Sequence, residues 1–288
     1  MAQIPARAPS ATAALRRGFN RRAAHYDQVA RWTGAIATEL TDRLQWLSFA
    51  PKTVLDLGAG TGSASRALKA RYPGAHVIAL DISEAMLVRL RPAWWRPISR
   101  VRGDAQALPV RTGSIDLICS SLLLPWLAEP MPALAEALRV LTPRGCLSFA
   151  TLGPGSLAEL ASAFTSVDDR RHRNLLPDMA DLAQLLTAAG FADPVLDIER
   201  ETRHCASTLE LLRLVHGCGF VVDAGRRRGL LGRQGLQRLE AAYESVRQPA
   251  GLPVTLEVIY GQAWRPGSAA PTRSRRGEAV VPISSIRR

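Results

Sequence analysis

The sequence has no long hydrophobic run, and this absence excludes one class of protein. None of its 288 residues lies in a run of the roughly 18 consecutive apolar residues that a membrane-spanning helix needs. The N-terminus also lacks the apolar core of a secretory signal. The sequence therefore predicts a cytoplasmic protein with no membrane partner.

Cysteine is scarce, and its spacing fits neither a disulfide framework nor a zinc site. The four cysteines have no pairing rhythm, which predicts reduced, structural thiols. One metal cluster can be imagined, formed by His204, Cys205, His216 and Cys218. No two of these residues have the Cys-x-x-Cys spacing of a zinc knuckle, so we expect no metal.

Acidic residues are absent from residues 1–22 and nearly absent from residues 265–288, so positive charge is concentrated at the two ends. Each of these segments carries +5 of the net charge of +12, which leaves +2 for the body. We expect residues 1–17 to be a disordered arm and residues 265–288 a disordered basic tail, flanking one domain at 18–264. A nearly balanced body offers no basic groove, so no nucleic-acid partner is expected.

What the sequence does contain is a glycine-rich turn directly after a short apolar run, at residues 54–62 (VLDLGAGTG). The run predicts a strand buried on both faces, and Ser63 begins a helix. Gly58, Gly60 and Gly62 allow a tight turn where a Cβ would collide with a ligand. The glycine spacing alone is weak evidence, because any strand-to-helix turn can use glycines.

Three acidic residues lie at the ends of three successive predicted strands, and they strengthen this interpretation. Asp56 precedes the first glycine by two positions, Asp81 ends the apolar run 76–80, and Asp104 follows a third, short strand. Ligands of open α/β sheets bind at the carboxyl ends of the strands, where an acid can bind both hydroxyls of a ribose. Each acid alone could be a helix cap or a turn residue, but together they predict a nucleotide-sized ligand.

Strands alternate with helices over residues 50–151, which predicts an α/β fold with a doubly wound, mostly parallel, Rossmann-like sheet. Seven strands are expected, the later ones at 114–119, 146–151, 194–203 and 254–264. A helical elaboration is expected after the fifth strand, at 152–190. In it, Ser156 should cap a helix with Glu159 as its capping-box partner, and a second helix should end at Gly190.

The turn with its three acids resembles the class I S-adenosylmethionine-dependent methyltransferases. Residues 18–263 resemble more narrowly the malonyl-[acyl-carrier protein] O-methyltransferase family of biotin synthesis. The segments that carry this second resemblance are FNRRAAHYD at 19–27, SSLLLPW at 120–126 and TLGPGSL at 151–157. It implies that S-adenosylmethionine donates a methyl group to the free carboxylate of a malonyl group on an acyl carrier protein.

The resemblance also implies where the cofactor lies. It places Asp56 near the amino acid end, Asp81 on the ribose and Asp104 beside the adenine. Further expected cofactor contacts are Gly58, Gly60, Ala105 and Ser120. The segment 120–126 should form the floor of the acceptor site.

No general base is expected, because a malonyl carboxylate is already ionised at neutral pH. The enzyme should instead work by positioning: Tyr26 would donate a hydrogen bond to the carboxylate, and Arg170 would clamp it in a bidentate pair. Exposed arginines would steer the acidic carrier, with Arg170, Arg171, Arg173 and Arg226 to Arg228 as candidates. Tyr26 could instead be a packing aromatic, and the charged run 168–174 a solvated turn.

Two rival classes stay open at this point. A nucleic-acid or small-molecule methyltransferase would share the cofactor site. Enzymes that methylate a base amino group usually have an Asn or Asp with two prolines after the fourth strand. The segment 120–123 has none of these residues. A non-enzymatic cofactor-binding protein would have a closed acceptor pocket.

Overall fold

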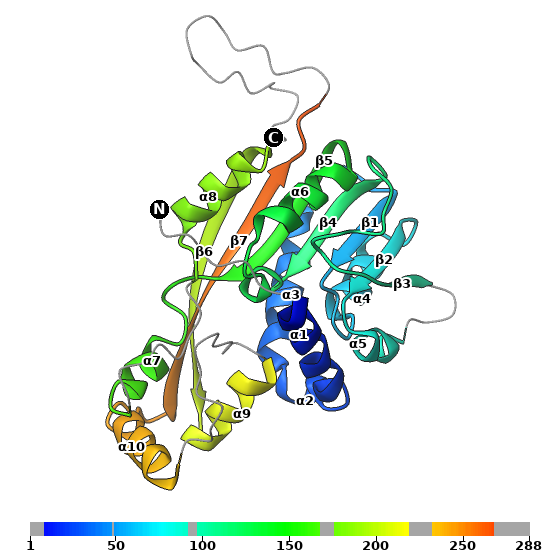
Figure 1. The fold of residues 1–288 in the computed structure, drawn as a ribbon. Coiled ribbons are helices and arrows are strands. Elements are labelled where there is room, and N and C mark those ends of the chain that lie inside the picture. The colour runs from blue at the N-terminus through cyan, green and yellow to red at the C-terminus, as the bar shows by residue number, and fades with distance from the viewer. Residues whose placement is uncertain (1–8, 48, 92–96, 168–175, 219–231, 268–288) are drawn as a thin grey trace, which may run out of the picture.

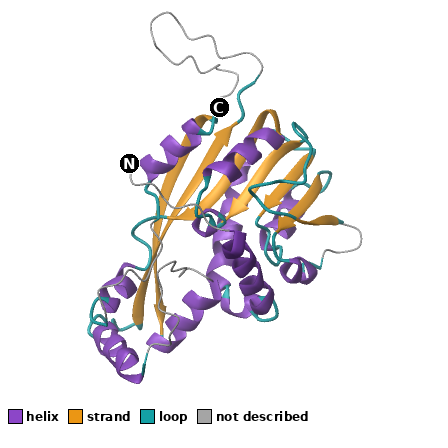
Figure 2. Ribbon diagram, viewed as in Figure 1, coloured by secondary structure: helices purple, strands orange, loops and turns teal. Residues whose placement is uncertain are grey.

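The fold is a seven-stranded sheet with helices on both faces (Figures 1 and 2). A computed structural model describes residues 9–47, 49–91, 97–167, 176–218 and 232–267. The strand order is β3-β2-β1-β4-β5-β7-β6. This is the doubly wound α/β sheet that the sequence predicts, and that prediction is confirmed.

Strands β1 to β5 run parallel, and only the last strand reverses direction. The strands are β1 Thr53–Leu57, β2 His76–Asp81, β3 Ile98–Arg102, β4 Ile115–Ser121, β5 Leu141–Leu152, β6 Ala192–Cys205 and β7 Leu252–Trp264. β7 pairs antiparallel with both β5 and β6, whereas β1 pairs parallel with β2 and β4. The carboxyl ends of β1 to β5 therefore meet at one edge of the sheet.

The sheet is buried because its central strands are apolar on both faces. Val54 and Leu55 of β1 have no exposed surface, and they belong to different core clusters. Alternate residues of a strand face opposite sides, so each cluster fills the space between one face of the sheet and its helices.

Helices connect the strands and cover both faces. They are α1 Pro9–Arg22, α2 Tyr26–Val29, α3 Arg31–Arg43, α4 Ser63–Arg71, α5 Glu84–Arg89, α6 Met131–Val140, α7 Ala158–Phe164, α8 Met179–Ala188, α9 Thr208–Cys218 and α10 Arg233–Glu244, with 3₁₀ turns η1 Leu44–Trp46 and η2 Leu124–Trp126. Long β6 and β7 extend beyond the rest of the sheet and carry α7, α9 and α10 at their far end (Figure 1).

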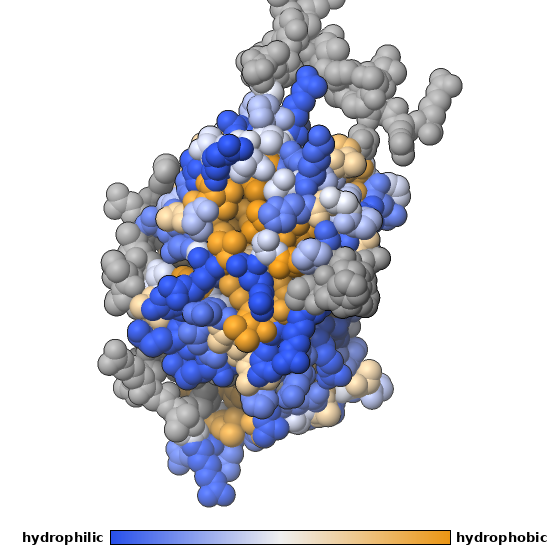
Figure 3. All heavy atoms as spheres, turned by 90° about the vertical axis from the view of Figure 1, so that its right-hand side faces the viewer, coloured by the Kyte–Doolittle hydropathy of each residue, from blue (hydrophilic) through white to orange (hydrophobic). Residues whose placement is uncertain are grey.

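None of the helices described combines the length and hydropathy of a membrane span. On the side toward β3 and α5, exposed hydrophobic residues form a central band between hydrophilic margins (Figure 3).

The N-terminal segment differs from the sequence prediction. Residues 9–17 belong to helix α1, so the expected disordered arm is wrong for this part, while residues 1–8 lie outside the described residues. The helix packs against α5, and this tertiary contact stabilises a segment that its composition alone would leave unfolded. At the other end, Arg265 donates a hydrogen bond of 3.2 Å to the Arg139 carbonyl, so the body of the protein extends past residue 264.

The cap at the start of α7 is also different from the prediction. The Ser156 hydroxyl does not cap a helix; it donates to the Glu257 carbonyl at 2.8 Å and accepts from the Glu257 amide at 3.0 Å. Glu159 accepts the Thr255 amide instead of forming a capping box. The side chains that a cap would use are thus hydrogen-bonded to the backbone of β7. By contrast, Asp178 caps α8 in a capping box, and Gly190 follows with a φ of 96°.

Candidate active site

The glycine turn after β1 forms the centre of the site. Gly58 and Gly60 have φ values of 80° and 54°, in the left-handed region that favours glycine. The amides of Gly58 and Ala59 both donate to the Leu80 carbonyl at 2.9 Å, which ties the turn to the end of β2. A Cβ at Gly60 would meet no atom within 4 Å, so this glycine faces open space. The turn therefore leaves room for a ligand against its backbone.

Asp81, at the end of β2, is held beside this turn. Its Oδ2 accepts the Gly60 amide at 2.8 Å, and its Oδ1 accepts the Ser83 amide at 2.7 Å. Burial raises the pKa of the Asp81 carboxyl, and the amide donors oppose that shift. Each carboxylate oxygen keeps a second lone pair, so the fixed carboxylate can still accept a ligand hydroxyl.

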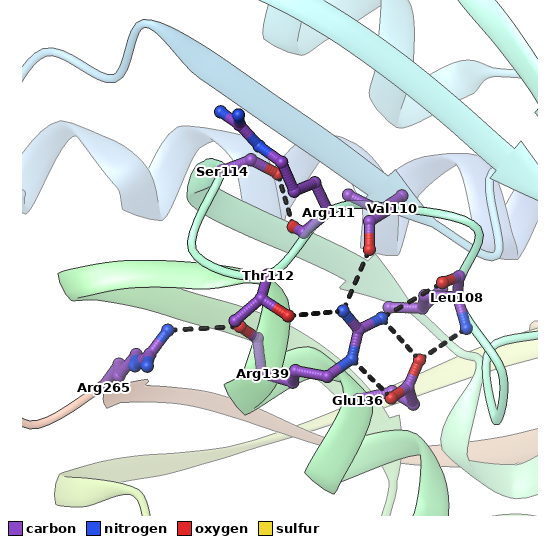
Figure 4. Close-up of polar contacts among 8 residues, drawn as sticks. All are labelled: Leu108, Val110, Arg111, Thr112, Ser114, Glu136, Arg139 and Arg265. Carbon is purple, nitrogen blue, oxygen red and sulfur yellow. Dashed lines mark hydrogen bonds and ion pairs between the residues drawn. The ribbon is translucent and has the colours of Figure 1, made fainter.

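Asp104 and Ala105 lie on the loop after β3. Glu136 and Arg139 of α6 hydrogen-bond the later part of this loop (Figure 4). The Oδ1 of Asp104 accepts the Gln106 amide at 2.9 Å. Further along the loop, Glu136 accepts the Leu108 amide at 2.7 Å. Arg139 donates to the Leu108 carbonyl at 3.1 Å, the Val110 carbonyl at 3.0 Å and Thr112 Oγ1 at 2.9 Å, and pairs with Glu136 at 2.7 Å. This ion pair fixes the loop that presents Asp104.

Asp56 is the most deeply buried of the three acids, at 1% exposure. The Ser65 hydroxyl donates to its Oδ2 at 2.5 Å. Burial raises the pKa of Asp56 to about 7, the Ser65 hydrogen bond opposes this, and the charge of Asp81 adds to it. A carboxyl with this pKa changes its charge near neutral pH.

Two hollows meet at the glycine turn. The first lies toward β2 and β3 and is lined by Asp81, Asp104, Ala105 and several apolar residues, among them Leu80, Ile82, Met86, Leu122 and Leu123. The second lies on the other side of the turn and is lined by Asp56, Thr61, Arg31 and Arg66. Five residues line both: Tyr26, Thr33, Gly58, Gly60 and Ser121. An elongated ligand could therefore cross the turn with one end in each hollow.

Helix α1 forms a wall of the first hollow, a role that the sequence interpretation missed. Thr12, Leu15 and Phe19 line the hollow. The Phe19 ring meets the Trp126 ring edge to face with centroids 4.6 Å apart, and the Ser83 hydroxyl donates to Asn20 Oδ1 at 2.7 Å. The spacing of residues 12, 15 and 19 places them on one face of a helix, and this pattern in the sequence could have indicated the role.

The structure brings most of the predicted site residues together, with two exceptions. The Ser120 hydroxyl donates to the Leu57 carbonyl at 2.9 Å, and Ser120 lines neither hollow; its neighbour Ser121 lines both. Alternate residues of β4 face opposite sides, which explains this difference. Arg170 lies outside the described residues, as do Arg171, Arg173 and Arg226 to Arg228. Tyr26 lies where the two hollows join.

These features fit S-adenosylmethionine. The first hollow offers acids for a ribose and an apolar slot for a planar base, and the second offers carboxylates and guanidinium groups for an amino acid. No group of three or more His, Cys, Asp and Glu side chains is placed to hold a metal ion within the described ranges. The sheet order and the two hollows define a class I S-adenosylmethionine-dependent methyltransferase.

Comparison with known proteins gives the family. Residues 55–149 match the family described as "Methyltransferase domain". The chain is 43% identical to a malonyl-[acyl-carrier protein] O-methyltransferase of Laribacter hongkongensis, over 93% of this chain and 94% of that one. It is 42% identical to a protein of the same name from Halorhodospira halophila, with 95% of each chain covered. The chain belongs to the malonyl-[acyl-carrier protein] O-methyltransferase family.

Solved structures agree on the fold. The solved structure of an S-adenosylmethionine-dependent methyltransferase from Thermotoga maritima superposes with a TM-score of 0.54. The superposition covers 87% of this chain and 99% of that one, at 17% identity. At this identity the similarity concerns the fold alone.

Proposed function

We propose that the protein transfers the methyl group of S-adenosylmethionine to the free carboxylate of malonyl-[acyl-carrier protein], an early step of biotin synthesis in the cytoplasm. The observation that carries this proposal is the 43% identity to a protein of that name along 93% of the chain. The two joined hollows support it, because they leave the reacting centre at the residues that both share.

The protein's part in the reaction is positioning. When bound, S-adenosylmethionine supplies an electrophilic methyl group on a sulfonium. A malonyl carboxylate has a pKa near that of other carboxylic acids, about 4, and is ionised at neutral pH, so no residue has to remove a proton. The residues around the shared position need only hold the carboxylate in line and keep water out.

Tyr26 is the side chain we assign to the acceptor carboxylate. It begins α2, is partly buried, and lines both hollows at their junction. Its hydroxyl can donate one hydrogen bond to a carboxylate oxygen without neutralising the nucleophile, as a tighter ion pair would. Arg170 remains a prediction for a second contact. Leu122 and Leu123, beside the shared position, supply the apolar surface that excludes water.

Malonyl and acetyl carrier proteins give the most direct test of the substrate. They share the carrier, the prosthetic arm and the thioester, but only the malonyl group has a free carboxylate. We expect labelled methyl to pass from S-adenosylmethionine to malonyl carrier and not to acetyl carrier. Labelling of both, or of neither, would refute the proposal.

A further inference from the structure

One face of α1 carries a group of arginines that the cofactor site does not use. Arg16, Arg17 and Arg21 are exposed, and no described carboxylate forms an ion pair with any of them. Residues 1–26 contain no Asp or Glu, so the helix holds no acid of its own. We call Arg16, Arg17 and Arg21 the basic face of α1.

Arg22, the last residue of the helix, is affected both by burial and by the charge next to it. Arg22 is half-buried, with its guanidinium 5.8 Å from the centroid of the Phe19 ring. Burial lowers the pKa of Arg22, and the charge of Arg21 lowers it further. Repulsion between like charges destabilises the folded state. An anionic partner bound at this face would reduce the repulsion, and this favours its binding.

The opposite face of the same helix lines the site, so a partner bound to the basic face would lie close to the site. Leu15 and Phe19 line the first hollow, so the basic face lies about one helix diameter, roughly 10 Å, from that hollow. A protein bound to the basic face could pass a flexible prosthetic arm around α1 to the reacting centre. The apolar face is turned into the protein, which argues against a lipid surface as the partner.

We propose that the basic face of α1 is the docking surface for the acyl carrier protein, an acidic protein; this proposal rests on the proposed function. Complementary charge at an exposed rim acts mainly on the association rate, which screening by salt reduces. The basic face should therefore govern kcat/KM for the carrier-bound substrate, while the chemical step depends on the residues inside the hollows.

The test is a triple variant, Arg16→Gln with Arg17→Gln and Arg21→Gln, compared with two matched variants. The first replaces the same arginines with lysine and keeps the charge. The second carries Arg71→Gln, Arg111→Gln and Arg233→Gln, which remove the same charge from exposed positions outside α1. Each is assayed with malonyl carrier protein and with malonyl-coenzyme A at low and high salt, and its affinity for S-adenosylmethionine is measured by calorimetry.

We expect the glutamine triple of α1 to lower kcat/KM for malonyl carrier at least about tenfold at low salt and to flatten its salt dependence. Turnover of malonyl-coenzyme A and the affinity for S-adenosylmethionine should stay as in the wild type, and both matched variants should behave as the wild type. The proposal is overturned by an unchanged rate with malonyl carrier, an equal loss with both substrates, or an equal loss in the second matched variant.

Binding of the carrier, measured by calorimetry without turnover, separates this proposal from the proposed function. If the wild type binds the carrier through α1 but methylates nothing, the docking surface stands and the activity fails. If duplex DNA competes with the carrier for the basic face at equal concentration, the partner is a nucleic acid and the docking proposal is wrong.

Discussion

The Thr61 hydroxyl donates a hydrogen bond of 2.6 Å to Oδ1 of Asp27. It joins the glycine turn after β1 to helix α2, which begins with Tyr26. Thr61 is 4% exposed and Asp27 is exposed, so the bond is partly buried. The residue assigned to the acceptor is thereby held to the turn that binds the donor.

Replacing Thr61 with valine should weaken cofactor binding without changing the size of the side chain. The change removes one hydrogen bond to a charged group, worth about 1.5 kcal/mol, so affinity should fall roughly tenfold. Calorimetric titration with S-adenosylmethionine measures it. Thr38→Val is the control, because the exposed Thr38 hydroxyl donates to the Gly34 carbonyl of its own helix, α3. Equal affinity in wild type and Thr61→Val would show that the Asp27 contact does not organise the site.

Asp81→Ala should have a larger effect on the same affinity. The carboxylate is expected to accept the ribose hydroxyls, and each charge-assisted hydrogen bond is worth about 1.5 to 3 kcal/mol. Its bonds to the Gly60 and Ser83 amides are lost as well, so thermal unfolding must be measured in parallel. If the folded variant binds S-adenosylmethionine as tightly as the wild type, Asp81 does not bind the ribose.

Tyr26→Phe removes only the hydroxyl from the junction of the two hollows. We expect kcat to fall by about tenfold to a hundredfold, with unchanged affinity for S-adenosylmethionine, because the bond is made to the acceptor. Single-turnover kinetics with malonyl carrier protein measures the chemical step. Wild-type turnover would mean that Tyr26 is a packing aromatic only.

Arg139→Gln should affect cofactor affinity from a distance. It removes the guanidinium that holds the carbonyls of Leu108 and Val110, so the loop bearing Asp104 would loosen (Figure 4). Stability should drop by about 2 kcal/mol, and affinity for S-adenosylmethionine should fall. Arg111→Gln is the matched control, since Arg111 is exposed and holds the loop through its carbonyl, which accepts the Ser114 hydroxyl and is kept in the variant. A loss of stability with unchanged affinity would limit Arg139 to a structural role.

Asp56 predicts a pH dependence of folding stability. Its pKa is about 7 in the folded protein, above the value of about 4 expected when unfolded. Between these values the folded state binds the extra proton, so this contribution is fully present below about pH 4 and is lost as the pH rises through 7. Asp56→Asn should therefore gain stability relative to the wild type between pH 4 and 7, by on the order of 1 kcal/mol per pH unit. The free energy of unfolding is measured with denaturant at several pH values. If it changes with pH in the same way for both proteins, this prediction is wrong.

The sequence predicted the sheet and the positions of the three acids because both follow from local patterns. Apolar runs such as residues 54–57 specify buried parallel strands, and the carboxyl ends of such strands converge whatever the details of packing. The cap of helix α5 is local in the same sense, because the Ser83 hydroxyl accepts the amide of Met86, three residues further on. These features need no knowledge of distant contacts.

The parts that could not be predicted depend on contacts between distant segments. Ser156 has the sequence context of a cap, but the backbone of β7 at Glu257 takes its hydroxyl. Helix α1 has a composition typical of a mobile arm and is ordered by contacts with Ser83 and Trp126. Whether Ser120 or Ser121 faces the site depends on the register of β4, which a one-residue shift reverses.

The proposed reaction requires that a terminal carboxylate oxygen of the malonyl group, and no other atom of it, receives the methyl. Both the terminal carboxylate oxygen and the acidic central carbon are nucleophiles that a sulfonium could methylate. Alkaline hydrolysis of the product made with a labelled methyl group distinguishes the two, because base cleaves the methyl ester and the carrier thioester but no carbon–carbon bond. We predict a methyl ester, so that base releases the label as volatile methanol. Label retained in the non-volatile acid released from the carrier would place the methyl on carbon and contradict carboxyl O-methylation.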